Sequence, residues 1–230
     1  IWTSCSPDFG EEAILSRISQ VNPKCLIYVN EYLWKGKLIS VTNKLNKIRS
    51  ALNSLEISLE IVTPNSSNKK NETNNTYSTI LKNFNSKEII FEQLEFNHPL
   101  YILYSSGTTG KPKSIVHSAG GTLLEHIKEH RLHCDIKRND VFFYYTSCSW
   151  MMWNWLVSGL ASGCSLVLFD GSPFYPNKLS TWKLIDDYNI TIYGTSAKYI
   201  NASSKFKLDV KSKLNLKSLK KIGRASCRER

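Results

Sequence analysis

The chain of 230 residues is long enough for one large domain or two small ones, and its 41% hydrophobic content and mean hydropathy of −0.28 exclude a disordered polypeptide. Its net charge of +11 comes mostly from Lys residues scattered among Asn and Ser. Nucleic-acid-binding domains more often gather Lys and Arg in one patch with interleaved aromatics. We therefore expect a solvated basic surface and no nucleic-acid partner, with a basic RNA- or DNA-binding domain as an alternative.

Helices and strands are predicted to alternate along the first half of the chain. Apolar residues at helical spacing predict helices over residues 11–21 and 37–55. The second of these helices is defined by Leu38, Val41, Leu45, Ile48 and Leu52. Short apolar runs predict strands over residues 25–29 and 57–62, and the polar stretch 65–75, NSSNKKNETNN, predicts a loop.

The alternation continues in the second half. Strands are predicted over residues 100–104, 114–117, 141–145, 165–169 and 190–193. Helices are predicted over residues 120–133, 151–161, 178–188 and from 197 onward. This order is typical of an α/β fold with mainly parallel sheets flanked by helices, a fold that binds ligands at the carboxyl ends of its strands.

An uncharged stretch of 29 residues lies between Asp140 and Asp170. A helix needs roughly 20 apolar residues to cross a bilayer, so the stretch is long enough. Ser, Thr, Asn and Gly interrupt it repeatedly, however, and we interpret it as strand, loop, helix, turn and strand. We expect no membrane span.

The two ends and the cysteines bear on the origin of the chain. Its first ten residues, IWTSCSPDFG, have no Met and no basic or apolar region of a signal peptide, and its six cysteines form no C-x-x-C pair. We expect reduced thiols, a cytoplasmic protein and an internal fragment of a longer chain. Residues 222–230, IGRASCRER, break the composition abruptly and resemble a translated sequencing adapter, so we predict that they are a non-native tail.

The most informative stretch is YSSGTTGKPK at residues 104–113. Gly107 and Gly110 permit positive φ and a close backbone approach, and successive amides in such a turn form an anion-binding concavity. Hydroxyl groups come from Ser105, Ser106, Thr108 and Thr109, and positive charge from Lys111 and Lys113. The spacing of the glycines is not that of a Walker A loop. The stretch predicts a polyphosphate site, and an ordinary Gly/Ser/Thr hairpin is the alternative.

This stretch resembles the phosphate-binding loop of the adenylate-forming superfamily, and the wider sequence is similar to the acetoacetyl-CoA synthetases within it. The similarity rests on IWTSCSPDFG, on HPLYILYSSGTTGKPKSIVHSAGGTLLEHIKEHRLH and above all on WMMWNWLVSGLASGCSLVLFDGSP. It runs from residue 1 to about residue 221. It implies that residues 1–221 are part of the large N-terminal AMP-binding (adenylation) domain of that fold.

The resemblance also implies which residues bind ligands. The triphosphate of ATP would contact Ser105, Ser106, Gly107, Thr108, Thr109, Gly110 and Lys113. The acyl pocket would be lined by Trp150, Met151 and Met152, with Ser149 in place of the Gly usual in the family. Ordinary core packing is the alternative for these aromatic residues, and Trp153 and Trp155 are expected to pack their helix.

The reaction implied is ATP-dependent ligation of acetoacetate to CoA through an acyl-adenylate, with ATP, Mg²⁺ and CoA as substrates or cofactors. The family's Y-G-x-T-E-like motif, ribose-binding aspartate and C-terminal lysine are not found in this sequence. We therefore assign no catalytic residue here and expect the fragment alone to be inactive. Alternatives are an acetyl- or propionyl-CoA synthetase and a non-catalytic nucleotide-binding module.

Histidines at residues 126, 130 and 133 follow helical spacing, which could suggest a metal site. Charged neighbours, among them Glu125 and Lys128, predict instead a solvent-facing helix without metal. His117, just after a predicted strand, is either near the phosphate site or buried and hydrogen-bonded.

Overall fold

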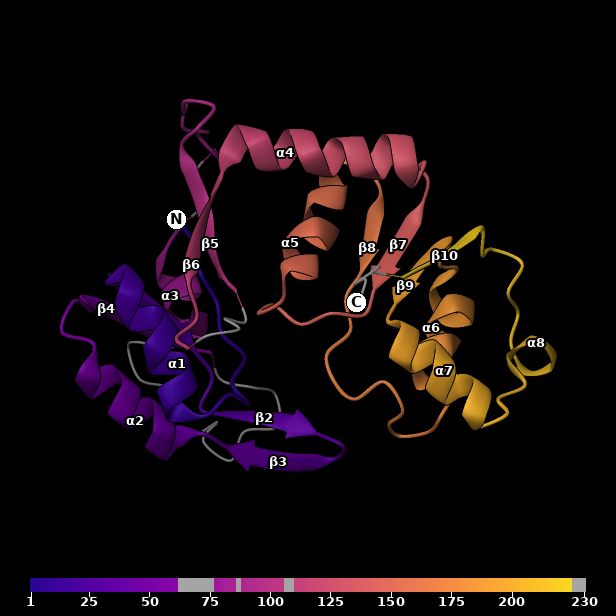
Figure 1. Cartoon of the computed structure of the whole chain (residues 1–230), viewed down its shortest axis with the longest axis horizontal. Coiled ribbons are helices and arrows are strands. Elements are labelled where there is room, and N and C mark those ends of the chain that lie inside the picture. The colour runs from indigo at the N-terminus through magenta and orange to yellow at the C-terminus, as the bar shows by residue number, and fades with distance from the viewer. Residues whose placement is uncertain (62–76, 86–87, 106–109, 225–230) are drawn as a thin grey trace. The chain divides into compact units, whose positions relative to one another are not determined.

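The computed structural model describes residues 1–61, 77–85, 88–105 and 110–224. It divides into two compact units, Ile1–Ala119 and Gly120–Arg230, and each is described by itself. The elements of the first unit are α1 (Glu11–Ile18), a 3-10 helix (Ser19–Val21), β1 (Cys25–Tyr28), β2 (Glu31–Trp34), β3 (Lys37–Ser40), α2 (Thr42–Ala51), β4 (Ile57–Glu60), α3 (Tyr77–Asn83), β5 (Pro99–Tyr104) and β6 (Ser114–Ser118) (Figure 1).

The core of the first unit lies where α1 and α2 pack together. Ile14 and Ile18 of α1 meet Ile48 of α2 and Leu52 just beyond it, and all four are buried. These residues recur every three to four positions, so each helix presents one apolar stripe, as the sequence predicted. Strands β1 and β4 pair in parallel beside them, with Cys25 opposite Ile57.

The prediction of a helix over residues 37–55 is wrong in its first part. Residues Lys37–Ser40 form β3, which pairs antiparallel with β2, and α2 begins only at Thr42. The two-residue turn between the strands has positive φ at both Lys35 (49°) and Gly36 (76°). Positive φ at both positions matches the twist of a tight hairpin, so the turn holds Leu38 in a strand although its spacing suits a helix.

Strands β5 and β6 form an antiparallel hairpin, with Tyr104 opposite Ser114. The start of the chain runs beside β5, because Trp2 forms a parallel bridge to Tyr101. The hydroxyl of Thr3 donates to the carbonyl of Ile102 (2.9 Å). The predicted strands at residues 100–104 and 114–117 are thus confirmed.

The second unit is built on a four-stranded parallel sheet in the order β10-β9-β7-β8. Its elements are α4 (Ala119–Lys128), a π-helix (Glu129–His133), β7 (Val141–Tyr144), α5 (Met151–Val157), a 3-10 helix (Ser158–Ser162), β8 (Ser165–Val167), α6 (Ser180–Tyr188), β9 (Ile192–Thr195), α7 (Ala197–Lys205), α8 (Val210–Lys213) and β10 (Lys221–Arg224). The α/β class with parallel strands is confirmed. The assignment of residues 222–230 to a non-native tail stays a prediction, with residues 225–230 outside the described part.

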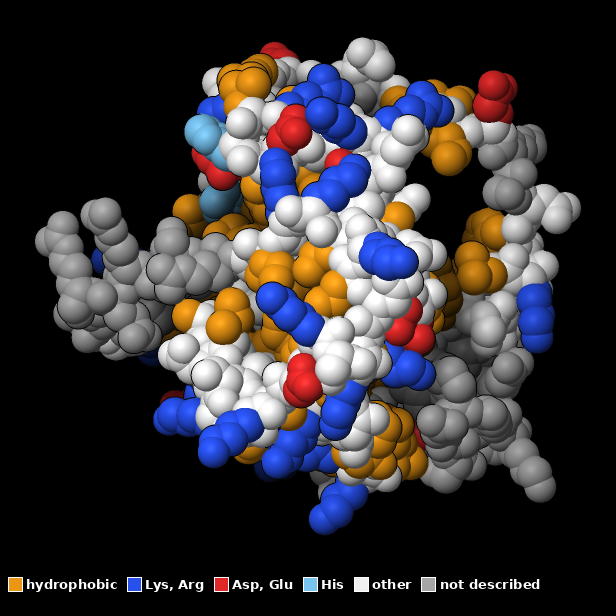
Figure 2. Space-filling model, turned by 90° about the vertical axis from the view of Figure 1, so that its right-hand side faces the viewer, with side chains coloured by type: hydrophobic (Ala, Val, Ile, Leu, Met, Phe, Trp, Pro, Cys, Tyr) orange, Lys and Arg blue, Asp and Glu red, His pale blue; other side chains and the backbone are white. Residues whose placement is uncertain are grey.

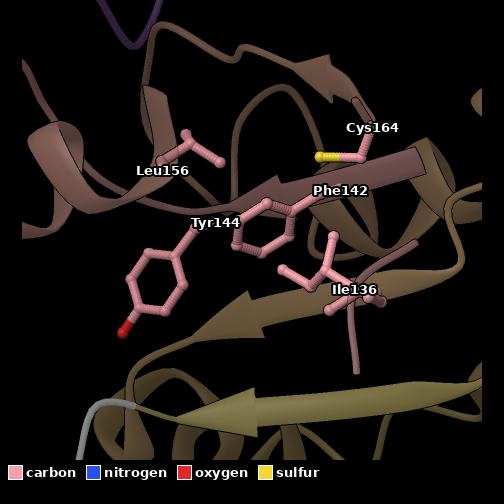
Figure 3. Packing of buried hydrophobic residues seen from close by; sticks show 6 residues of the cluster. Ile136, Phe142, Tyr144, Leu156 and Cys164 are labelled. Atoms are coloured by element: carbon pink, nitrogen blue, oxygen red, sulfur yellow. The ribbon is translucent and has the colours of Figure 1, made fainter. Parts of the chain in front are cut away.

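Strand β7 divides two apolar layers because its side chains alternate between the faces of the sheet. On one face, Phe142 lies among Ile136, Leu156 and Cys164 (Figure 3). On the other face, Phe143 is fully buried against helices α6 and α7. Helix α5 therefore covers one side of the sheet, and α6 and α7 cover the other.

The prediction of a solvent-facing histidine helix is wrong for two of the three histidines. His126 and His130 are 8% and 0% exposed, whereas His133 is exposed. His126 and His130 are four residues apart, so they share the helix face that packs against α5 and β7. Among the described residues, no group of three or more His, Cys, Asp or Glu side chains is arranged to hold a metal ion.

Basic side chains do not gather in one patch on the face drawn in Figure 2. On the face drawn in Figure 2, Lys and Arg side chains lie dispersed among apolar and uncharged ones. Within the described part of the chain, no helix has both the length and the apolar character that a bilayer crossing requires.

Candidate functional site

The first candidate group lies at the tip of the β5–β6 hairpin. Ser105 and Lys113 close the base of the loop: the amide of Ser105 donates to the carbonyl of Lys113 (3.0 Å), and the amide of Lys113 donates to Ser105 Oγ (3.3 Å). This pair extends the strand register one step beyond Tyr104 and Ser114. The structure thus holds the two ends of the loop together at a fixed separation.

Gly110 is the one glycine of the predicted phosphate loop that the structure describes. Gly110 has φ of +144° and is exposed, with open space where a Cβ would lie. Such a φ favours glycine on backbone grounds alone. Ser106, Gly107, Thr108 and Thr109 fall outside the described residues.

A long-range hydrogen bond holds the same loop from the side. The side-chain amide of Gln20 donates to the carbonyls of Pro112 (2.9 Å) and Ser16 (2.5 Å). Gln20 and Pro112 also line an open hollow of about 480 Å³, together with Ser19, Lys111 and Lys113. The described residues that line the hollow offer ammonium and hydroxyl donors and include no carboxylate, so the hollow suits an anionic ligand.

The second candidate group lies in the other unit, at the start of α5. Trp150 is the N-cap residue of that helix and has an extended backbone, and its side chain is 65% exposed. Met151 is 52% exposed, whereas Met152 packs against the cluster around Phe142. The side chains of Trp150 and Met151 are therefore exposed, whereas that of Met152 packs against the core.

The topology of the sheet gives an independent reason to place a ligand here. The chain leaving β7 enters α5 on one face, whereas the chains leaving the neighbouring strands β8 and β9 enter helices on the other face. In open parallel sheets, ligands bind outside the carboxyl ends of strands at such a switch point. The segment after β7 is 145–150, so Trp150 lies at the end of the switch-point loop.

Polar contacts order this loop. Tyr145 donates its hydroxyl to the carbonyl of Gly171 after β8 (2.9 Å), and burial raises the pKa of the Tyr145 phenol. Ser147 and Ser149 share a hydroxyl–hydroxyl hydrogen bond (3.0 Å), and the amide of Trp150 donates to the carbonyl of Ser147 (3.1 Å). Ser149, where the resemblance predicts Gly, takes part in this hydroxyl–hydroxyl hydrogen bond.

His117 lies on β6, opposite Tyr101 on β5, and their rings are 5.0 Å apart. It is half-buried, and burial lowers its pKa. The ring therefore packs within the hairpin rather than among the loop residues at its tip.

Comparison with known proteins now assigns the fold. The sequence profile described as "AMP-binding enzyme" matches residues 1–229. The chain belongs to the AMP-binding enzymes. Among curated relatives, it is 45% identical over 206 residues to the acetoacetyl-coenzyme A synthetase of Rhizobium meliloti (strain 1021), covering 89% of this chain and 32% of that protein. It is 39% identical over 244 residues to the malonamoyl-CoA synthetase vrtB of Penicillium aethiopicum, covering 96% of this chain and 34% of that protein.

A solved structure gives the same result in three dimensions. The acetoacetyl-CoA synthetase from Streptomyces lividans matches with a TM-score of 0.90 and 39% identity, covering 97% of this chain and 34% of that chain. The chain spans about a third of the length of the relatives it matches. The predicted adenylate-forming fold is confirmed.

The structure brings part of the predicted site together. Ser105, Gly110 and Lys113 are neighbours in one loop, and Trp150, Met151 and Met152 begin one helix. Sequence reasoning did not find the contact of Gln20 with the loop, because 92 residues separate Gln20 from Pro112 and no motif marks it.

Proposed function

We propose that the complete protein containing this chain is an acetoacetate–CoA ligase. Acetoacetate would attack the α-phosphorus of ATP to give acetoacetyl-adenylate and pyrophosphate, and the CoA thiol would then displace AMP. The observation that carries the proposal is the 45% identity over 206 residues to a protein named for this product. The phosphate loop and the open Trp150–Met151 pair supply sites of suitable chemistry.

We assign the β5–β6 loop to the β- and γ-phosphates. Amides and hydroxyls of Ser105, Ser106, Gly107, Thr108, Thr109 and Gly110, with the Lys113 ammonium, would bind the phosphate oxygens and offset their charge. The Ser105–Lys113 pair supports this role, because it holds the loop ends in place before ATP arrives and lowers the entropy lost on binding.

We assign Trp150, Met151 and Met152 to the wall of the acyl pocket. Trp and Met together make a small, adaptable apolar surface suited to a short acyl chain. The relatives named acetoacetyl- and malonamoyl-CoA synthetase both act on acids with a second carbonyl two carbons from the carboxylate. That shared chemistry favours a 3-oxo acid over acetate or propionate here.

Mg²⁺ belongs to the proposal as the metal that accompanies the triphosphate and neutralises its charge. In the described part of the chain, no trio of His, Cys, Asp or Glu side chains is placed to ligate a metal. We therefore assign no Mg²⁺ ligand to this chain. The cytoplasmic location is also proposed, and it fits the absence of disulfides among the five cysteines of the described part. Fractionation of cells that express the complete protein would test that location.

The test is acid-dependent ATP–pyrophosphate exchange by the complete protein. We expect kcat/KM to be highest for acetoacetate, above acetate and propionate. Higher values for acetate or propionate would transfer the proposal to those acids. ATP binding without exchange for any acid would establish the non-catalytic nucleotide module, and salt-sensitive binding to RNA or DNA would favour the basic-domain alternative.

Two lysine variants distinguish a direct contact of the loop with ATP from a general effect of removing one positive charge. Lys113→Ala is expected to raise KM for ATP about tenfold, since one charge-assisted contact is worth about 1.4 kcal/mol or more. Lys47→Ala, at an exposed lysine on α2 of the same unit, is the matched control and should leave that KM unchanged. The isolated 230-residue chain should produce no acetoacetate-dependent AMP over multiple turnovers.

A further inference from the structure

A chain of hydrogen bonds joins α4 to the end of α5. His126 Nδ1 lies 2.8 Å from Ser158 Oγ, and Ser158 Oγ donates to the carbonyl of Trp155 (2.8 Å). Because the single hydroxyl proton of Ser158 is used on that carbonyl, its oxygen accepts from His126, which places a proton on Nδ1 of the imidazole. His126 is buried, so this is an interior contact.

Trp155 is fixed by its ring as well as by its carbonyl. The ring packs edge-on against His130 (4.6 Å between centroids), Phe142 (5.3 Å) and Tyr144 (5.9 Å). Phe142 and Tyr144 belong to the central strand β7, so the last turn of α5 is anchored to the sheet as well as to α4. Such aromatic contacts fix orientation in addition to burying area.

The other end of α5 carries Trp150 and Met151, whose side chains are exposed rather than packed against α4 or β7. Trp150 makes no side-chain capping hydrogen bond and is exposed. From Met151 to Ser158 the helix rises about 10 Å, so a tilt of about 6° at the anchored end would move its first residue by about 1 Å. A misplacement of that size near reacting groups can change rates by about a hundredfold.

We propose that His126 is a positioning residue that sets the acyl pocket through Ser158 and Trp155, and thereby a determinant of acid specificity. The inference rests on the proposed function, since it takes Trp150 and Met151 as pocket residues. His126 itself touches no substrate in this scheme. It acts by fixing the tilt and rotation of α5.

The test compares KM for the acid with KM for ATP in variants of the complete protein, beginning with four single substitutions. His126→Leu removes the donor, and His126→Asn keeps an N–H near the position of Nδ1. Ser158→Ala is a smaller change that removes the acceptor. His133→Leu makes the same substitution as His126→Leu at an exposed position of the next turn and serves as the control.

We expect His126→Leu and Ser158→Ala each to raise KM for acetoacetate about tenfold, or to reduce selectivity over propionate about tenfold, with KM for ATP within about twofold. The double variant should be little worse than either single one, because both break the same connection. His126→Asn should recover most of the loss, and His133→Leu should match the wild type.

Three outcomes would overturn the inference: unchanged acid KM and selectivity in both His126→Leu and Ser158→Ala, equal losses for acid and ATP, or no recovery in His126→Asn. If His126→Leu does not fold, Ser158→Ala decides the question alone. The variants Trp150→Ala and Met151→Ala distinguish a failure of this inference from a failure of the proposed acyl pocket. If they alter acid KM while the His126 and Ser158 variants do not, only the inference fails; if they too leave acid KM unchanged, the pocket assignment fails.

Discussion

His130 should make the second unit sensitive to mild acid. Its side chain is 0% exposed, between the rings of Trp155 and Phe142, and neither ring nitrogen has a hydrogen-bond partner of normal geometry among the described residues. Burial, reinforced by the nearby His126, lowers the pKa of His130 to about 4. The unfolded chain would bind this proton near the ordinary value of about 6.5.

The sign follows from which state binds the proton first. As pH falls from about 6.5 to about 4, the unfolded state gains a proton that the folded state does not accept, so the free energy of unfolding decreases. Between pH 7.5 and 4.5 this one group lowers the free energy of unfolding by roughly 2–3 kcal/mol, and the loss levels off below pH 4.

The perturbation is His130→Phe, which keeps a ring between Trp155 and Phe142 but cannot be protonated. We expect its free energy of unfolding, relative to that of the wild type, to rise by roughly 2–3 kcal/mol as pH falls from 7.5 to 4.5. Urea unfolding followed by tryptophan fluorescence at several pH values measures this difference. His133→Phe, the same change at an exposed position, should run parallel to the wild type. Parallel profiles for His130→Phe and the wild type would refute the reasoning.

Three further substitutions test the packing of the central sheet. Gly194→Ala should lower the free energy of unfolding by about 1–3 kcal/mol, because the new Cβ would lie 2.1 Å from Cδ2 of Tyr144 and displace that ring; an unchanged urea midpoint would contradict this. Phe143→Ala, at a fully buried ring, should cost about 3–5 kcal/mol and lower Tm in calorimetry, whereas a loss below 1 kcal/mol would show that the site collapses. Asp140→Asn should lower the free energy of unfolding by about 1–3 kcal/mol at pH 7, as measured by urea unfolding. On acidification, the free energy of unfolding of this variant should fall by less than that of the wild type. Burial alone would raise the pKa of Asp140, but hydrogen bonds from the Lys220 ammonium (2.8 Å) and the Thr191 hydroxyl (2.8 Å) lower it overall. The stabilisation by the carboxylate therefore disappears as pH falls through the folded pKa, and equal acid sensitivity of both proteins would exclude this.

Periodicity predicted most of the helices and strands, but it missed β2 and extended the helix of α2 backwards over β3. Leu38 continues the helical spacing of Val41 and Leu45, yet it lies in a strand because the Lys35–Gly36 turn returns the chain along β2. The turn has no Asn-Gly or Asp-Gly signature, so its geometry was not readable from residue types.

The histidine helix shows a second limit. Charged residues at 125, 128 and 129 indicated an exposed helix, and those side chains do form surface ion pairs. Which face of the helix is buried is decided by the partner it meets, and here α5 and β7 meet the face that bears His126 and His130. Helical spacing alone gives the stripe but not its environment.

The part of the candidate site that could be predicted from the sequence is the part formed by consecutive residues. The order of hydroxyls, glycines and lysines in residues 104–113 located the loop. Its closure by Ser105 and Lys113 follows from the register of β5 and β6. The hydrogen bonds from Gln20 to Pro112 and from His126 to Ser158 join residues that are far apart in the sequence. Such contacts form only when the chain folds, so no local motif predicts them.

The strand order β10-β9-β7-β8 also bears on how the sheet is assembled. Strand β7 comes first in the chain and ends in the interior of the sheet, with β8 added to one side, β9 to the other and β10 beyond β9. No later strand has to separate a pair that has already formed. We therefore expect the sheet to grow outward during synthesis, with each new strand pairing to an edge strand that is already in place. In pulse-labelled hydrogen exchange, amide protons of the β7–β8 pair should be protected before those of β9.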